Sequence, residues 1–338
     1  MRGSSGAKPS IASANKLVLN RGHDSSPIPR RSPLVRQPTT HYPLAAIDQG
    51  AYLLAILASL RGATAIQLRR AVFDRTSATP HQSRYRATKS LRRLFDAGFV
   101  RRVPVFCPSA RSDQLSLQVM HTLSASGAWA IGFDPSLVRS RSPKARSVLT
   151  HDFWLIELGV LALEGCPERL TVTHWWNDRV LAARKRTGQL SLPTIPDALL
   201  VVRNSETGKD FPCLLELDLG TESVTARGAV RADVNRKVEG YLEYLGAGFR
   251  HDFGIDAPPI VLIVTDSERR LASLRAATQR LGGGGRFWFA TLHRLRHDGD
   301  LDTKQMDSSP GPQGAFWGLN WQTAHQAGVR SLAARCGV

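Results

Sequence analysis

Between residues 150 and 297, short apolar runs alternate with helix-like segments in an order that few folds can accommodate. The order reads helix, three strands, helix, strand, helix, strand, and Thr150 is expected to cap the first helix. Helices that alternate with strands in this way pack on the faces of a mixed sheet. This half of the chain is therefore expected to form an α/β sandwich. The expected strands are 170–175, 198–202, 213–219, 260–265 and 287–292, and the expected helices are 150–163, 230–246 and 268–281.

The preceding segment, residues 45–134, predicts three helices followed by a β-hairpin. The first helix is expected at 48–60. Thr64 followed by Gln67 predicts a capping box at the start of the second, and Thr79-Pro80 followed by Gln82 marks the start of the third. Strands at 99–103 and 115–121, joined by a polar turn, complete a pattern typical of a winged helix-turn-helix domain. The expected fold is thus multi-domain α/β.

The third helix carries an apolar row and a polar row. The spacing of Ala87, Leu91, Leu94 and Phe95 predicts that these side chains pack inward. On the polar row, Arg and Gln can read guanine and adenine edges and Lys suits phosphate, while arginines on the hairpin suit the DNA backbone. The candidate DNA-contacting residues are Gln82, Tyr85, Arg86, Lys89 and Arg93 on the helix, and Arg101, Arg102 and Arg111 on the hairpin.

The net positive charge lies entirely in the first half of the chain. Residues 1–150 account for the formal net charge of +17, whereas residues 151–338 hold equal numbers of basic and acidic residues. A strongly basic segment favours a polyanionic partner such as double-stranded DNA. Two alternatives stay open. An Arg-rich composition can come from a GC-rich genome, although this leaves the neutral second half unexplained, and a charged helix face can also belong to a module that binds protein.

The remaining segments are polar. Residues 1–44 are expected to form a disordered basic arm, 135–149 a linker, and 298–338 a polar tail that is partly ordered around Trp317 and Trp321. No apolar run approaches the roughly 20 residues of a membrane helix, and no apolar core of a secretory signal follows the first basic residues. Four cysteines without a CxxC pair argue against a zinc ribbon or a disulfide scaffold. We therefore expect a cytoplasmic protein with no membrane partner.

Acidic residues gather where two of the expected strands meet. Asp197 begins one strand, and Glu216 and Asp218 share one face of the next because side chains alternate along a strand. If the two strands pair as a hairpin, Asp197 comes close to Glu216. Converging carboxylates can hold Mg²⁺ or Mn²⁺, which polarises a phosphoryl group and activates water. Alternatively, Asp197 is a turn residue, and the strand acids form an ion pair with Arg231, Arg236 or Lys237.

Asp197, Glu216, the element order and the basic helix after the acidic strand resemble the PD-(D/E)XK nuclease superfamily. The resemblance implies that Asp197 and Glu216 bind metal and that a lysine two residues later orients water. This sequence departs from the pattern there, because Asp218 stands at the lysine position. In some members the lysine lies on the following helix, where Lys237 can substitute. The first helix often supplies a further carboxylate, which makes Glu157 a candidate fourth ligand beside Asp197, Glu216 and Asp218.

More narrowly, the span 48–293 resembles the replication-relaxation family of bacterial plasmids and mobile elements, whose members join a winged helix to a nuclease-like domain. The resemblance implies DNA binding during plasmid replication, relaxation or mobilisation, with a relaxase or a replication initiator as a further partner. The stretches that carry it are 123–129, 151–157, Pro196-Asp197, the block Glu216-Leu217-Asp218-Leu219-Gly220-Thr221-Glu222, and 237–241.

Two hypotheses follow. In the first, the protein is a non-catalytic accessory factor that binds duplex DNA through the winged helix. In the second, it is a metal-dependent DNA endonuclease or nickase in which Asp197, Glu216 and Lys237 are catalytic. The extra negative charge of Asp218 would repel a scissile phosphate unless a cation neutralises it, so the first hypothesis is favoured.

Overall fold

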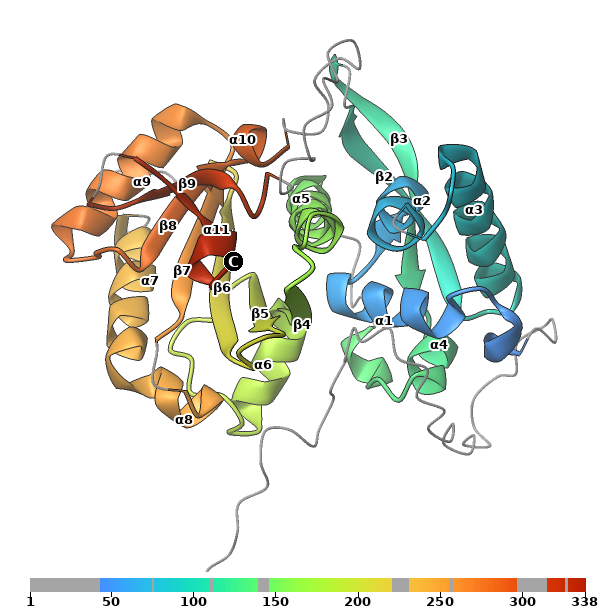
Figure 1. Cartoon of the computed structure of the whole chain (residues 1–338), viewed down its shortest axis with the longest axis horizontal. Helices are drawn as coiled ribbons and strands as arrows, with labels where there is room; N and C mark the ends of the chain where they lie inside the picture. Colours follow the sequence, from blue (N-terminus) through green and yellow to red (C-terminus); the bar gives the residue numbers. More distant parts are fainter. Residues whose placement is uncertain are drawn as a thin grey trace, which may run out of the picture.

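The computed structural model describes residues 43–74, 76–109, 112–138, 146–220, 231–255, 258–296, 315–325 and 328–338. Within these residues the chain is a mixed α/β protein with two separate sheets, as expected from the sequence. We call residues 43–138 the N-terminal module and residues 146–338 the C-terminal module. Figure 1 shows them side by side, with one long helix, α5 (Arg146–Glu164), between the two sheets.

The N-terminal module contains the helices and the hairpin that the sequence predicts. Thr64 and Gln67 form the predicted capping box, and Thr79 caps the third helix by accepting a hydrogen bond from the Gln82 amide (3.1 Å). Its small sheet has the order β1-β3-β2. The elements are η2 (Leu44–Ala46), α1 (Gly50–Leu60), β1 (Ala63–Thr64), α2 (Ala65–Leu68), η3 (Arg69–Phe73), α3 (Pro80–Asp96), β2 (Val100–Ser109), β3 (Ser112–Leu123), α4 (Ala125–Ala130) and η4 (Pro135–Leu137).

The C-terminal module is built on a larger sheet, whose order in the described part of the chain is β10-β9-β8-β7-β6-β5-β4. The strands β6, β7 and β8 are parallel, and the other neighbours pair antiparallel. Every residue of β7 and β8 is buried, as expected for parallel strands covered on both faces. The strands are β4 (Leu170–Asn177), β5 (Ala198–Asn204), β6 (Asp210–Asp218), β7 (Ile260–Thr265), β8 (Phe287–Thr291), β9 (Leu319–Thr323) and β10 (Val329–Ser331).

Helices cover this sheet on both faces. Figure 1 shows α7 and α9 on the outer face, away from α5 and the N-terminal module. The long helix expected over 230–246 is divided, because a π-helical segment follows α7 and a further short helix follows that segment. Besides α5, the helical elements are α6 (Asp178–Arg186), α7 (Arg231–Glu243), η5 (Tyr244–Gly248), α8 (Phe249–Phe253), α9 (Glu268–Arg280), α10 (Leu292–Arg296) and α11 (Leu332–Arg335).

Other features also differ from the sequence predictions. The helix α5 begins at Arg146, so Thr150 lies inside the helix and does not cap it. The helix α6 was not predicted. It starts at Asp178 and is capped by Asn177, whose side chain accepts hydrogen bonds from the amides of Arg179 and Val180. The C-terminal tail contributes two strands to the large sheet, and its Trp317 and Trp321 are fully buried.

The two modules are joined by charged and polar contacts as well as apolar ones. Asn177, at the end of β4, donates hydrogen bonds to the carbonyl oxygens of Ala58 (3.2 Å) and Ser59 (2.9 Å) on α1. Gly159 on α5 allows a close approach, since a Cβ added there would lie 2.3 Å from Cδ2 of Leu60. The modules therefore contact each other both at the end of β4 and along α5.

Candidate functional site

The outward face of α3 carries aromatic and basic side chains. Gln82, Tyr85 and Lys89 are exposed, and Tyr85 retains 58% of its accessible surface. The Lys89 ammonium lies 5.4 Å from the centroid of the Tyr85 ring, within cation–π range. Arg93, one turn further along the helix, is half-buried. The structure thus places three of the five predicted helix residues where a macromolecular partner can reach them directly.

Arg86 lies differently from its predicted outward position. Its guanidinium forms an ion pair with Asp48 (Nε–Oδ2 2.8 Å) and donates a hydrogen bond to the carbonyl oxygen of Thr76 (3.0 Å). It also lies 5.2 Å from the centroid of the Phe73 ring. These contacts leave only 22% of the side chain exposed. Arg86 therefore fastens α3 to the chain segments before α1 and after η3.

The hairpin and α3 share a cation–π contact. Arg101 and Arg102 are exposed on β2, as predicted, whereas Arg111 lies outside the described residues. The Arg102 guanidinium lies 4.1 Å from the centroid of the Phe95 ring. The prediction that Phe95 packs inward is wrong, because 39% of its surface is exposed beneath this arginine. Ala87, Leu91 and Leu94 are buried as predicted.

The same hairpin contains one buried histidine. His121 on β3 pairs in register with Arg102 on β2, and its Nδ1 atom has no hydrogen-bond partner in the structure. Burial, together with the positive charge of Arg102, lowers the pKa of His121 to about 4. The ring is therefore neutral at physiological pH.

The acidic residues of β5 and β6 come together as the hairpin prediction required. Ala198 pairs with Leu215 in an antiparallel register, which brings Asp197 beside Glu216. The Asp197 Oδ2 atom accepts a hydrogen bond from the Leu217 amide (2.8 Å) and lies 3.3 Å from Nε2 of His151 on α5. The Asp197 carboxylate raises the pKa of His151 against the opposing effect of burial.

Glu216 is buried between two donors on α7. The Lys237 ammonium donates a hydrogen bond to Oε2 (3.3 Å), and the Tyr241 hydroxyl donates one to Oε1. Burial and the negative charge of Asp197 raise the pKa of Glu216 to about 7, although Lys237 and Tyr241 act in the opposite direction. Burial also raises the pKa of the Tyr241 hydroxyl well above its ordinary value, which keeps it a donor.

Asp218 and Glu157 are each held by an arginine. Arg270 on α9 donates to Asp218 Oδ2 from Nη2 (2.6 Å) and Nε (3.2 Å). Glu157 receives Nη1 of Arg70 at Oε1 (2.6 Å) and Nε2 of Gln67 at Oε2 (2.9 Å), both from the N-terminal module. Glu157 therefore joins the two modules, with both of its carboxylate oxygens committed to protein donors.

Two residues of this cluster were not assigned by the sequence analysis. His151 falls within a stretch that resembles the family, but nothing in its spacing connects it to Asp197, because the contact depends on how α5 crosses the sheet. Arg270 lies 52 positions after Asp218 and reaches it only through the packing of α9. The ion pair of Glu216 with Lys237 is one of the alternatives that the sequence left open.

The four carboxylates predicted as metal ligands thus each have a basic partner of their own. Among the described residues there is no group of three or more His, Cys, Asp or Glu side chains placed to hold a metal ion. A divalent ion prefers about six oxygen ligands, whereas the oxygens here receive protein hydrogen bonds. A divalent ion bound here would therefore have to displace these donors from the carboxylate oxygens.

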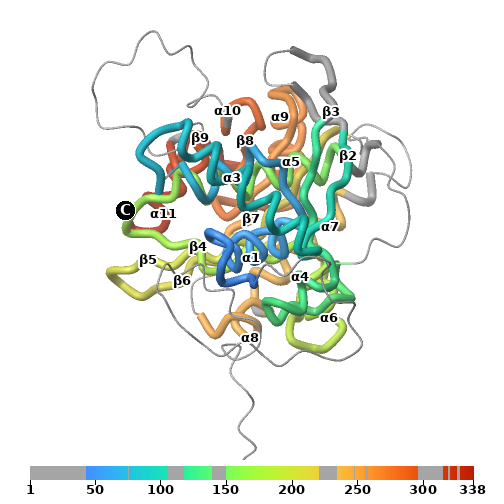
Figure 2. The backbone as a smooth tube through the Cα atoms, turned by 90° about the vertical axis from the view of Figure 1, so that its right-hand side faces the viewer, coloured from blue at the N-terminus to red at the C-terminus, as the bar shows by residue number. Residues whose placement is uncertain are grey.

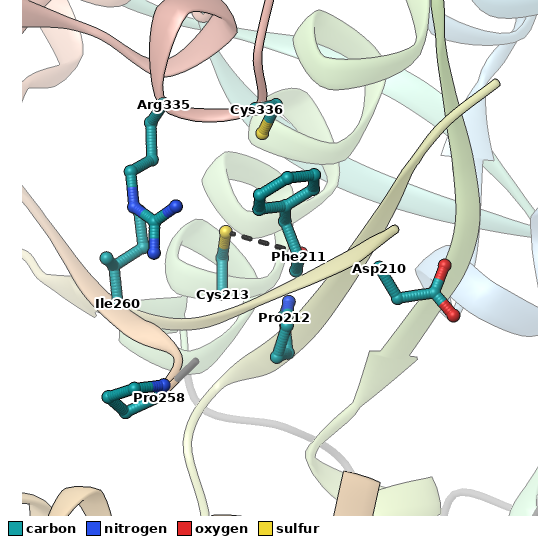
Figure 3. Close-up of a pocket in the computed structure, with 8 residues that line it drawn as sticks. All are labelled: Asp210, Phe211, Pro212, Cys213, Pro258, Ile260, Arg335 and Cys336. Atoms are coloured by element: carbon teal, nitrogen blue, oxygen red, sulfur yellow. Dashed lines mark hydrogen bonds between the residues drawn. The ribbon is translucent and has the colours of Figure 1, made fainter. Parts of the chain in front are cut away.

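A small pocket lies at the opposite end of β6 from the acidic cluster (Figure 3). Cys213 on β6, together with Cys336 and Arg335 at α11, lines it. Burial raises the pKa of the Cys213 thiol well above its ordinary value and that of Cys336 to about 12. Both thiols are therefore protonated at neutral pH and are poor nucleophiles.

The fold and these surfaces define a mixed α/β protein with a basic N-terminal module and an acidic cluster on its larger sheet. Residues 54–254 match the family described as Replication-relaxation. This match covers more than half of the chain, and the protein belongs to that family, which links it to the replication or relaxation of plasmids or mobile elements. No match was found among curated proteins or among solved structures. In the part of the chain that the structure describes, no helix is both long and apolar enough to cross a bilayer.

Proposed function

We propose that the protein is a DNA-binding accessory factor in the replication, relaxation or mobilisation of a plasmid or mobile element. Its N-terminal module would bind duplex DNA as a winged helix-turn-helix domain. The observation that carries this proposal is the exposed aromatic and basic face of α3, flanked on the hairpin by Arg101 and Arg102. A relaxase or a replication initiator would act beside it at the same DNA.

The charge distribution supports this assignment. The first 150 residues carry the entire net positive charge, and cationic side chains that neutralise phosphates supply most of the affinity of non-specific DNA binding. An α-helix fits the major groove of B-DNA, and a neighbouring hairpin can then contact the backbone. In this arrangement α3 would read bases and the hairpin would fix the orientation of the module.

The proposal is tested by measuring the affinity of the whole chain for a duplex of roughly 30 base pairs by fluorescence anisotropy. Arg101→Ala combined with Arg102→Ala should weaken binding roughly ten-fold, because each removes a positive charge from the proposed surface. The matched control is Arg269→Ala combined with Arg280→Ala, which removes two exposed positive charges from α9. Equal losses of affinity in the two variants would show that the N-terminal module contributes no more to DNA binding than α9 does. Absence of binding by the wild type would contradict the proposal.

The second candidate function is metal-dependent cleavage of DNA by Asp197, Glu216 and Lys237. One observation favours it: the fold brings these three side chains together from β5, β6 and α7. The occupied carboxylate oxygens count against it. Arg270 neutralises Asp218, so the repulsion of a scissile phosphate that the sequence suggested does not count against it. Mg²⁺ and Mn²⁺ remain the cofactors that this function would need.

A plasmid assay separates the two candidates. Supercoiled plasmid is incubated with Mg²⁺ or Mn²⁺ and with wild type, Asp197→Asn or Glu216→Gln protein. The accessory role predicts the same trace of nicked product in all three reactions. Nicking by the wild type that both substitutions abolish would establish the endonuclease instead.

A further inference from the structure

Outside its buried face, α3 carries two rows of side chains with different neighbours, and Arg86 and Arg93 in these rows are half-buried. Positions four apart on a helix lie on the same side, one turn above each other. We call one set the hairpin row and the other the turn row, and Tyr85 lies between them. The hairpin row is Arg84, Thr88, Arg92 and Phe95, and the turn row is Gln82, Arg86, Lys89 and Arg93.

The hairpin row borders the β2–β3 hairpin. Phe95, at the end of this row, lies under the guanidinium of Arg102 on β2, which fixes the side of α3 on which the hairpin stands. Figure 2 views the N-terminal module from the side of α3 and shows β2 and β3 along one flank of the helix. Arg84 and Thr88 are exposed, and 78% of the Arg92 side chain is accessible. Its contact with Asp96, 3.7 Å away, is an exposed pair that contributes little.

The turn row borders the other flank of the helix. There Arg86 is held by Asp48 and by the carbonyl oxygen of Thr76, so the chain before α1 and the turn after η3 lie against this side. A duplex bound to the turn row would lie against these segments, on the side of α3 away from the hairpin.

We infer that duplex DNA contacts the hairpin row, so that Arg84, Thr88 and Arg92 face the major groove while Arg102 contacts the adjacent backbone. This inference rests on the proposed function and assigns the DNA-facing side of α3. A rigid duplex can touch helix and hairpin together only on the flank that they share. Arg84 and Arg92 are two turns, about 12 Å, apart along α3, which suits contacts at separate base pairs. Thr88 lies between them, and its methyl and hydroxyl groups can contact base edges.

The neighbouring arginines 92 and 93 provide a matched test. Arg92→Ala and Arg93→Ala remove the same charge from adjacent positions on different rows. Affinity for the duplex is measured by anisotropy with the full chain, and the melting temperature of each variant verifies that it is folded. Arg92→Ala and Arg84→Ala should each weaken binding roughly ten-fold, while Arg93→Ala should change it by less than about two-fold.

The outcomes separate this inference from the proposed function. Loss of affinity in Arg93→Ala and Lys89→Ala, with Arg84→Ala and Arg92→Ala unchanged, would place DNA on the turn row and overturn the inference while DNA binding stands. Absence of binding by the wild type would overturn both. A double-mutant cycle adds a second readout. Since Arg102 is proposed to contact a phosphate and Arg92 a base edge, Arg102→Ala should lower the salt dependence of binding, alone or combined with Arg92→Ala. Arg92→Ala alone should weaken binding with little change in that dependence.

Discussion

The guanidinium of Arg70, on the N-terminal module, lies 2.6 Å from the carboxylate of Glu157, on α5. A second carboxylate, Glu164, lies equally close to another nitrogen of the same guanidinium. Arg70 thus connects the N-terminal module to the C-terminal module by binding two carboxylates of α5. The α5 helix also carries His151 against Asp197, so the position of the basic module is set by the helix that contacts the acidic cluster.

Substituting Arg70 should destabilise the whole chain. In Arg70→Met, the buried carboxylate of Glu157 keeps only Gln67 as a partner. Breaking a buried ion pair by removing one partner costs about 3–5 kcal/mol, and unfolding in urea should report a loss near the lower limit because Arg70 is partly exposed. The control is Arg169→Met, which breaks the exposed pair with Glu206 and should cost less than ~1 kcal/mol. Similar losses of stability in both variants would mean that the buried pair at the interface stabilises the protein no more than the exposed pair does.

Enlarging Gly159 should also destabilise the protein, although alanine favours helices by about 1 kcal/mol over glycine. A Cβ at this position would lie 2.3 Å from Leu60 Cδ2, so α1 and α5 must separate slightly. We expect a net loss of about 1–3 kcal/mol in urea unfolding. Gly246→Ala serves as the control, since no atom lies within 4 Å of its added Cβ. A Gly159→Ala protein as stable as the wild type would show that this interface is loosely packed.

His121 should make the protein sensitive to acid. Its folded pKa of about 4 lies below its ordinary value of 6.5, so the unfolded chain takes up a proton first as the pH falls. The contribution of the neutral ring is complete above pH 6.5 and declines between pH 6.5 and 4, by up to ~3 kcal/mol. His121→Leu should flatten this part of the stability curve measured by urea unfolding. An unchanged decline in that variant would place the acid sensitivity elsewhere.

Glu216 should make the protein less stable as the pH rises, which is the opposite of the effect of His121. Its folded pKa of about 7 lies above its ordinary value of 4.5, so the folded protein retains a proton that the unfolded chain has lost. The contribution of the protonated group is present below pH 4.5 and is lost as the pH rises to 7. Glu216→Gln should therefore gain stability relative to the wild type above pH 7 and differ little below pH 4.5. A constant difference at every pH would mean that Glu216 ionises normally.

Local signals in the sequence predicted most of the elements. The capping residues Thr64 and Thr79 placed two helix starts, because a cap depends on residues three positions apart. The alternation of side chains on β6 placed Glu216 and Asp218 on one face. Pairing of β5 with β6 then brought Asp197 to Glu216, as the hairpin prediction required.

Contacts between distant segments were not predictable in this way. The partners of Asp218 and Glu157 are arginines on other elements, and their positions depend on how α9 and α5 pack. The strands β9 and β10 are short, and they become strands only because β9 pairs with β8 and β10 then pairs with β9. Arg86 has the same helical spacing as the exposed residues Gln82 and Lys89. Its half-buried position depends on the contact with Asp48, which the spacing does not predict.

The most direct test of the proposed DNA binding is the dependence of affinity on salt. Anisotropy titrations of the wild-type chain with duplex DNA should give a log–log plot that falls linearly, with a slope that grows by about 0.9 for each phosphate contact. Arg102→Ala should reduce this slope and Arg269→Ala should leave it unchanged. An affinity that stays the same between low and high salt would contradict an electrostatic DNA-binding surface on the N-terminal module.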